Sequence, residues 1–500
     1  MDMETTVLTG ILIICLYIFL KVFRTARRNC LPPFPGVPIP IIGHLHLLKP
    51  PLHRTLYRLS QNHGPLLSLR LGSRLVVVVS SPSLAEECFT THDAVLANRP
   101  LNLAGKYIGY NNGTMAGLPY SDQWRHLRRL SAQEIFSAAR LNSFLSIRQD
   151  EVKHLLQSIY RDSKTSFAKV ELKPKLGQAA FNVIMRMIAG KRYFGENDNQ
   201  ETKNNVPELI NEVMETAEAS NPEDFFPLLR WLDFRGLKKK LARLGDRMDA
   251  FQQSLIDEHR REKRSSTMIG HLLSLQESQP LYYTDLTIKG LINNMIVAGT
   301  DTSAVTMEWA MSALLNHPEV MKKARAELDR VVGCGRLVDE PDLSELPYLQ
   351  CIISETFRLF PAGPMLLPHY SSQPCKVGGY EIPSDTMLLV NAWAVHRDPG
   401  LWDDPMRFLP KRFEGKEGES SNSQLLMPFG MGRRSCPGAG LARRMIGLVL
   451  ASLIQCFDWE RVTKDQVDMT EGKGLTMPKA KPLEAMCKAR EEMHKVLALP

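Results

Sequence analysis

One cysteine of this chain lies in a setting that suits a metal ligand. Cys436 stands in the string FGMGRRSCPG, residues 429–438, directly before an apolar stretch that predicts a helix from about Ala439. Glycines permit tight turns and let a flat ligand approach the backbone. The amide dipoles of a helix N-terminus stabilise a thiolate, and a lone thiolate is one way to hold haem iron. For an isolated Gly-x-Cys the alternative is a buried structural cysteine, but the whole string favours the ligand.

An acid and an alcohol stand together in the middle of a helix predicted over residues 285–316. The string Ala-Gly-Thr-Asp-Thr-Ser, residues 298–303, contains Asp301 and Thr302. Because Ser and Thr hydroxyls can bond to carbonyls of the preceding turn, this string should weaken the helix ladder and open it locally. The pair suits general acid catalysis, which is typically worth about 10²–10⁴-fold in rate. A kink without chemistry is the alternative.

Two further pairs have helix spacing. Glu355 and Arg358, at i and i+3 on a helix predicted over residues 348–359, share one face. On their own they would most often form a surface ion pair worth about 0.2–0.5 kcal/mol. Trp124 and Arg128, at i and i+4, are both donors to carboxylates. Packing and solvent contact are the alternative for this second pair.

The N-terminal segment predicts a membrane anchor. Residues 5–23 are almost wholly apolar, and a helix of this length, at about 1.5 Å per residue, nearly spans a hydrocarbon core of roughly 30 Å. Basic residues follow the segment, so residues 1–4 are expected in the lumen and the body in the cytosol. A cleaved signal peptide is disfavoured, because its basic residues would precede the apolar stretch. A basic, proline-rich hinge over residues 24–45 then leads to a catalytic domain over residues 46–500.

Composition excludes several classes of protein. The chain has 500 residues, 44% of them apolar and 23% charged, as in an ordinary globular protein. Its nine cysteines form no CxxC pair, so neither a disulfide framework nor a zinc finger is indicated. A net charge of +8 is too weak to indicate nucleic acid. Helical patterns dominate the body, among them one over residues 84–92, with Ser83 as its cap, and one over residues 123–135. Short strands are expected at 75–79, 376–382 and 386–390, so one large, mostly helical domain is predicted.

The string around Cys436 resembles the haem-binding loop of the cytochrome P-450 monooxygenases, and the likeness covers essentially the whole chain. The other three constellations have that family's order and spacing. The resemblance implies a mainly α fold with small β-sheets, the cytochrome P-450 haem-thiolate fold, behind an N-terminal transmembrane anchor. It also implies haem b (iron protoporphyrin IX), O2 as a substrate, and NADPH-derived electrons from a membrane-bound NADPH–haemoprotein reductase, because no flavin or dinucleotide motif is evident.

The resemblance assigns roles to individual residues. Thr302 would donate to dioxygen and Asp301 would relay protons, both as catalytic residues. Cys436 would be the metal ligand, and the haem contacts would come from Cys436, Trp124, Arg128, His369, Arg434, Phe429 and Gly438. A structural triad would join Glu355, Arg358 and Arg412, the last from the string Pro-Lys-Arg-Phe at residues 410–413. Lys411 departs from the family, in which many members have an acidic residue at this place.

Several strings resemble the plant microsomal (A-type) group, closest to the branch acting on isoflavonoids, lignans and related phenolics. These strings are residues 109–111, 229–233, 391–399 and 474–479. They imply a single-pass protein of the endoplasmic reticulum membrane that hydroxylates a small aromatic plant metabolite and has no nucleic-acid partner. Substrate loops would fall near residues 101–115, 225–231, 295–302, 366–369 and 475–477. Arg433, Arg443 and Arg444 are candidates to meet an acidic surface of the reductase.

Alternative activities stay open at this point. On the same site, a relative could close a ring by phenol coupling or a methylenedioxy bridge instead of hydroxylating. A haem-thiolate isomerase or dehydratase would need no reductase, although Asp301 and Thr302 argue against it. A haem carrier or sensor without turnover would have no use for these two side chains.

Overall fold

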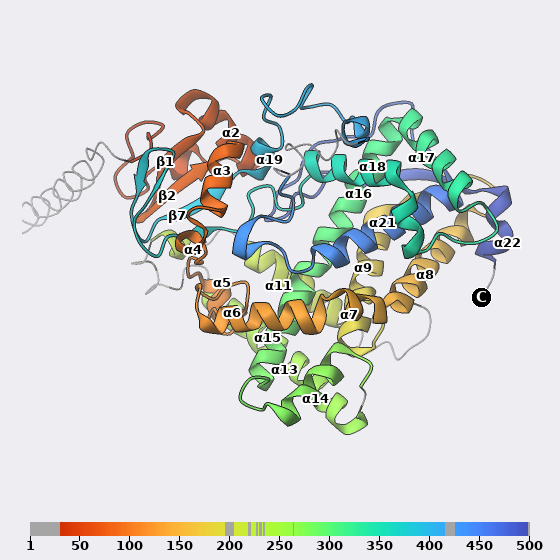
Figure 1. Cartoon of the computed structure of the whole chain (residues 1–500), viewed down its shortest axis with the longest axis horizontal. Coiled ribbons are helices and arrows are strands. Elements are labelled where there is room, and N and C mark those ends of the chain that lie inside the picture. Colours follow the sequence, from red (N-terminus) through yellow and green to blue (C-terminus); the bar gives the residue numbers. More distant parts are fainter. Residues whose placement is uncertain are drawn as a thin grey trace, which may run out of the picture.

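The computed structural model describes residues 31–195, 205–218, 222–226, 229, 233, 236–263, 265–415 and 426–498. The predicted luminal residues 1–4 and membrane anchor 5–23 lie outside the described residues, as do the first part of the predicted hinge and most of the expected substrate loop at 225–231. The described body is mainly helical with three small sheets, as expected (Figure 1).

The α-helices of the described residues are α2 (Leu52–His63), α3 (Pro82–Phe89), α4 (Asp93–Leu96), α5 (Leu103–Tyr107), α6 (Asp122–Leu130), α7 (Ala138–Ser143), α8 (Leu145–Ser163), α9 (Leu172–Ala189), α11 (Asn205–Glu218), α12 (Pro222–Phe225), α13 (Leu237–Glu262), α14 (Met268–Ser278), α15 (Asp285–Gly299), α16 (Asp301–Asn316), α17 (Pro318–Val331), α18 (Pro347–Leu359), α19 (Ala392–Val395), α21 (Ala439–Cys456) and α22 (His494–Leu497).

The strands form three sheets. One has the order β1 (Leu66–Leu71), β2 (Arg74–Val79), β7 (Met387–Val390) and β4 (His369–Tyr370); a second has β3 (Ala168–Glu171), β9 (Glu484–Ala489) and β8 (Phe457–Arg461). The third is the hairpin of β5 (Cys375–Val377) and β6 (Tyr380–Ile382). The single strand predicted over residues 376–382 was therefore wrong. Gly378 and Gly379, both at positive φ, form the turn that folds it into two strands.

Two helix boundaries also differ from the prediction. The helix expected to start after Ser83 begins at Pro82, because proline at the first helical position already has a helical φ. The helix predicted over residues 123–135 ends as an α-helix at Leu130 and continues as a π-helical turn, Ser131–Ile135. Trp124 and Arg128 both lie in the α-helical part, α6.

α16 forms the centre of the helical core. It packs against α9 on one side and against α18 and α21 on others, and Figure 1 shows it crossing the middle of the molecule. Residues Ser303–Leu315 of this helix are all buried, so both its polar and its apolar side chains lie in the interior. A helix in this position can carry chemically active side chains out of bulk water.

Two observations concern the membrane. Among the described residues, one helix, α21, is long and apolar enough to cross a bilayer, but 72% of it is buried inside the protein, as in a core helix. The described part of the proline-rich segment packs on the first sheet: the amide of Ser68 donates to the carbonyl of Pro33 at 2.8 Å, and Gly43 pairs with Leu71. The end of this segment is therefore fastened to the body and does not project from it.

Candidate active site

The loop before α21 presents Cys436 at the start of that helix. The Cys436 amide donates to the carbonyl of Phe429 at 2.8 Å, which closes the loop on itself. Gly432 has a φ of +66°, and a Cβ at this position would lie 2.7 Å from Oδ1 of Asp93. Glycine is therefore required at Gly432 both by the backbone and by the close approach of α4.

The thiol of Cys436 lies in a recess. The residue has accessible surface, yet enough protein surrounds it that burial raises the pKa of the thiol. Three groups oppose this effect and lower the pKa: the backbone amides of Gly438 and Ala439, at the N-terminus of α21, and the guanidinium of Arg128. Arg128 also donates from Nη2 to the hydroxyl of Ser435 at 3.2 Å. The sulfur therefore lies beside groups that favour its anionic form, although burial outweighs them in this structure.

Further donors gather beside this loop. Each guanidinium nitrogen of Arg434 donates to a backbone carbonyl within residues 97–118, and the guanidinium carbon lies 4.4 Å from the ring centroid of Trp124. Burial lowers the pKa of Arg434 to about 10, with the nearby Arg128 as a further cause. His369 donates from Nδ1 to the carbonyl of Leu96 at 2.9 Å, and burial lowers its pKa well below the usual range, so its ring is neutral.

Arg99 belongs to the same group of donors, although no motif in the sequence indicated it. Its Nη1 donates to the carbonyls of Leu367 and Pro368 at 3.0 and 2.6 Å, while its Nε is buried without a hydrogen-bond partner. Burial lowers the pKa of Arg99 to about 9, and the charge of Arg434 acts in the same direction. Arg99 lies between Asn98 and Pro100 and has no partner at helix spacing, so the sequence does not mark it as a candidate site residue. Its role follows only from its neighbours.

These residues fit a haem. Among the described residues no group of three or more His, Cys, Asp and Glu side chains could hold a metal ion, whereas haem iron needs a single axial thiolate such as Cys436. The buried, unpartnered Nε of Arg99, beside Arg434 and close to His369, provides donors for carboxylates such as the haem propionates. In this structure Trp124 donates from Nε1 to the carbonyl of Met115 at 3.1 Å, so its own propionate contact stays a prediction.

The expected triad beneath this loop is in contact. Arg358 binds Glu355 with two hydrogen bonds of 2.7 and 2.9 Å, and Arg412 donates from Nε to the same carboxylate at 3.1 Å. The side chains of Glu355 and Arg358 are 0% exposed and that of Arg412 is 11% exposed. The remaining donors of Arg358 reach the carbonyls of three residues between 396 and 407. The triad thus fastens α18 to the segment that precedes the cysteine loop.

His396 extends this connection. Its carbonyl accepts from Arg358 at 2.9 Å, and its Nε2 accepts the amide of Met427, also at 2.9 Å, two residues before Phe429. Burial lowers the pKa of His396 to about 3, so the ring is neutral and Nε2 acts as an acceptor. The start of the cysteine loop is therefore held to the triad through one histidine.

The predicted opening of the long helix occurs at Thr300. α15 ends at Gly299 and α16 begins at Asp301, so the single helix predicted over residues 285–316 is divided. The hydroxyls of Thr300 and Thr302 donate to carbonyls of the preceding turn, Ile296 at 3.1 Å and Ala298 at 2.7 Å. The Asp301 carboxylate accepts from the hydroxyl of Thr476 at 2.8 Å, a contact that no motif in the sequence indicated.

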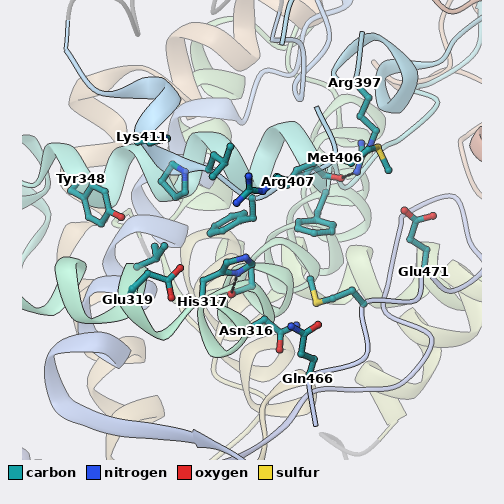
Figure 2. Close-up of a pocket in the computed structure, with 18 of the residues that line it drawn as sticks. Asn316, His317, Glu319, Tyr348, Arg397, Met406, Arg407, Lys411, Gln466 and Glu471 are labelled. Atoms are coloured by element: carbon teal, nitrogen blue, oxygen red, sulfur yellow. Dashed lines mark hydrogen bonds between the residues drawn. The ribbon is translucent and has the colours of Figure 1, made fainter. Parts of the chain in front are cut away.

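A separate cavity of about 530 Å³ lies away from this site (Figure 2). Figure 2 shows Arg407, His317 and Asn316 near its middle, with Glu319 and Tyr348 on one side and Glu471 on the other. Neither Cys436 nor Asp301 lines it. Its lining adjoins the triad, because the carbonyl of Arg407 accepts from Arg358 and the amide of Leu409 donates to Glu355, but it does not include the cysteine or the acid of the candidate site.

Known proteins are similar to this chain in sequence and in fold. The family model described as Cytochrome P-450 matches residues 32–485. A (+)-piperitol/(+)-sesamin synthase of Sesamum radiatum is 57% identical over 470 residues, covering 93% of this chain and 92% of the relative. An isoflavone 3'-hydroxylase of Medicago truncatula is 54% identical over 487 residues, covering 95% and 96%. A solved zebra fish cytochrome P-450 structure with progesterone has a TM-score of 0.76 at 26% identity, covering 88% of this chain and 99% of that one.

The family match spans nearly the whole described body, and the relatives exceed half identity over almost their full length. Members of the family are monooxygenase enzymes that use haem, with electrons from NADPH delivered by a reductase. The relatives place the sequence near the isoflavonoid and lignan branch of the plant A-type group. The chain therefore belongs to the cytochrome P-450 family.

Proposed function

We propose that this enzyme hydroxylates the ring of an aromatic plant specialised metabolite of phenolic, flavonoid, isoflavonoid, lignan or benzophenone type, with O2 and NADPH-derived electrons. When bound, a haem-thiolate iron supplies dioxygen activation and oxygen transfer. The observation that carries the proposal is the opened helix at Asp301 and Thr302, in a helix that packs against the one starting after Cys436. A carrier or an isomerase would have no use for a proton relay at this place.

In this proposal Cys436 ligates iron, and Arg99, Arg128, Arg434 and His369 orient the porphyrin through its carboxylates. Their burial supports the role, because a charge-assisted hydrogen bond is strongest where water is excluded. Thr302 holds a proton at Oγ1, and Asp301 replaces it from water. Glu355, Arg358 and Arg412 take no part in proton transfer and keep the cysteine loop in place.

Oxidative ring closure is the second candidate. The relative named (+)-piperitol/(+)-sesamin synthase is 57% identical to this chain, and the relatives named isoflavone 3'-hydroxylase and isoflavone 2'-hydroxylase are 54% and 52% identical. These values are too similar to favour one outcome. Both reactions consume O2 and NADPH, so the products must distinguish them.

The test is expression of the full chain in microsomes with a plant reductase. Flavonoids, isoflavones, lignans and benzophenones would be supplied one at a time, and products would be identified by mass. A product heavier by one oxygen supports hydroxylation, and a product lighter by two hydrogens supports ring closure. Product formation without NADPH consumption would instead indicate an isomerase or dehydratase. Haem binding without turnover of any compound would contradict the proposal.

We further propose that the chain is a single-pass protein of the endoplasmic reticulum membrane. We also propose that the reductase docks on the face carrying Arg433, Arg443 and Arg444. Arg443 is exposed and lies 5.3 Å from the ring centroid of Phe429, whereas the other two arginines pair with acidic side chains. Arg443→Glu should therefore raise the reductase concentration needed for half-maximal rate, with a weaker effect as salt increases. An unchanged requirement at low salt would contradict this docking face.

A further inference from the structure

One contact of Asp301 points to control of proton delivery by the C-terminal part of the chain. Asp301 is the first residue of α16, and its Oδ2 accepts the hydroxyl of Thr476, 175 residues later, at 2.8 Å. We propose that Thr476 is a positioning residue: it holds the Asp301 carboxylate, which lines a cavity, in the orientation from which a proton passes to Thr302. The inference rests on the proposed function and deepens it.

The cavity in question has a volume of about 360 Å³ and lies between α9, α11 and the junction of α15 and α16. Because a water molecule occupies about 30 Å³, the cavity has room for several of them. Its polar lining includes Lys173, Gln178 and Asn211 on the two outer helices, opposite Thr300 and Asp301 on the junction. Asp301 therefore borders a space that can supply protons from solvent.

Thr302 does not open into this cavity. Neither Thr302 nor Ala298 lines the cavity, although the two are neighbours of residues that do. Ala298 is nevertheless exposed, and the hydroxyl of Thr302, which donates to its carbonyl, is exposed with it. Asp301 thus lines the cavity, whereas Thr302, the next residue, does not. A proton that passes from Asp301 to Thr302 needs the carboxylate in one defined orientation, which a hydrogen bond to a charged group can impose.

The donor of this hydrogen bond sits on a segment that is fastened independently. The indole of Trp309 donates to the carbonyl of Met477 at 2.7 Å, and the amide of Leu483 donates to Oε1 of Glu308 at 2.8 Å. Removing the Thr476 hydroxyl leaves both of these contacts to α16 in place. The effect on Asp301 can therefore be tested without detaching the segment.

The experiment compares the full chain with Thr476→Val, which is nearly isosteric but lacks the hydroxyl, and with Thr476→Ser, which keeps it. The matched control is Thr463→Val, because Thr463 also places its hydroxyl near a carboxylate, Asp465 at 3.5 Å, but on the exposed surface. Each variant is combined with reductase and NADPH, with and without isoflavone. Product, peroxide, NADPH and the solvent isotope effect are measured, and the haem content is obtained from the carbon monoxide difference spectrum.

The stoichiometry defines the readout. Productive turnover is RH + O2 + NADPH + H⁺ → ROH + H2O + NADP⁺, and failed proton delivery diverts it to NADPH + H⁺ + O2 → NADP⁺ + H2O2. Thr476→Val loses a hydrogen bond to a charged group. The ratio of peroxide to hydroxylated product should therefore rise about tenfold in this variant, and the solvent isotope effect should increase. Thr476→Ser and Thr463→Val should stay within about twofold of the unchanged chain.

Two comparisons separate the explanations. If Thr476 acts through Asp301, the double variant Asp301→Asn with Thr476→Val should release no more peroxide than Asp301→Asn alone. The inference is overturned if Thr476→Val leaves the peroxide ratio unchanged while Asp301→Asn raises it. It is also overturned if Thr476→Val loses haem and Thr476→Ser restores it, since that outcome is a structural role. If even Asp301→Asn has no effect, the proton relay of the proposed function is itself wrong.

Discussion

Removing Arg358 should be among the most damaging single changes in this protein. Arg358 and Glu355 are both 0% exposed, and two hydrogen bonds of 2.7 and 2.9 Å join them. Arg358→Met would leave a buried carboxylate with Arg412 as its one remaining arginine partner. It would also remove a donor from three backbone carbonyls, of which that of Arg407 would keep only a 3.5 Å bond from Arg412. Breaking such a buried pair typically costs about 3–5 kcal/mol of the free energy of unfolding.

The same geometry predicts a graded series. Arg412 makes one bond of 3.1 Å to Glu355 and is partly accessible, so Arg412→Met should cost less, about 1.5–3 kcal/mol. Arg407→Met is the matched control: its side chain is 69% exposed and lies 3.4 Å from Asp404, so the change should stay within about 0.5 kcal/mol. Arg358→Lys should not restore the stability lost in Arg358→Met, because lysine cannot form the two parallel hydrogen bonds to Glu355.

The assay is urea unfolding of the full chain in detergent, followed both by tryptophan fluorescence and by the haem absorption band. The order of destabilisation should be Arg358→Met, then Arg412→Met, then Arg407→Met. The double variant Glu355→Met with Arg358→Met should be less destabilised than Arg358→Met alone, because no carboxylate is left buried without its main partner. If Arg358→Met cost no more than Arg407→Met, or if the double variant were the least stable, the reasoning about buried charge would be refuted.

Three further outcomes are expected. Cys436→Ala should abolish the red-shifted carbon monoxide band and turnover, and turnover retained without that band would contradict thiolate ligation. Gly432→Ala should destabilise the protein by about 1–3 kcal/mol in thermal unfolding, since its Cβ would meet Asp93 at 2.7 Å, whereas Gly440→Ala, nearest contact 3.5 Å, should be nearly neutral. His396 has a folded pKa of about 3 against 6.5 unfolded, so its contribution to stability is fully present above pH 6.5 and is lost as pH falls toward 3. Replacing it with Asn should flatten the stability profile between pH 4 and 6.5 by roughly 1.4 kcal/mol per pH unit, and an unchanged slope would contradict a neutral buried ring.

The contacts of Thr302 show which features can be predicted from residues that are close together in the sequence. The opening of the helix near Thr300 could be predicted, because the competition between hydroxyls and backbone amides involves residues within one turn. The i, i+3 spacing of Glu355 and Arg358 is local in the same sense. Cys436 could be placed before α21 because its glycines and the apolar stretch adjoin it in the chain. The sequence alone therefore located the candidate metal ligand, Cys436, and the helix that follows it.

The tertiary structure decided what those residues touch. Arg99 donates to two carbonyls more than 260 positions away in the sequence. Asp301 accepts the hydroxyl of a threonine 175 positions later. His396 holds the cysteine loop by accepting an amide from Met427, and two glycines turn one predicted strand into the hairpin of β5 and β6. The physical reason is that helix spacing and capping depend on neighbours along the chain, whereas burial, pKa and long-range partners depend on which segments the whole core brings together.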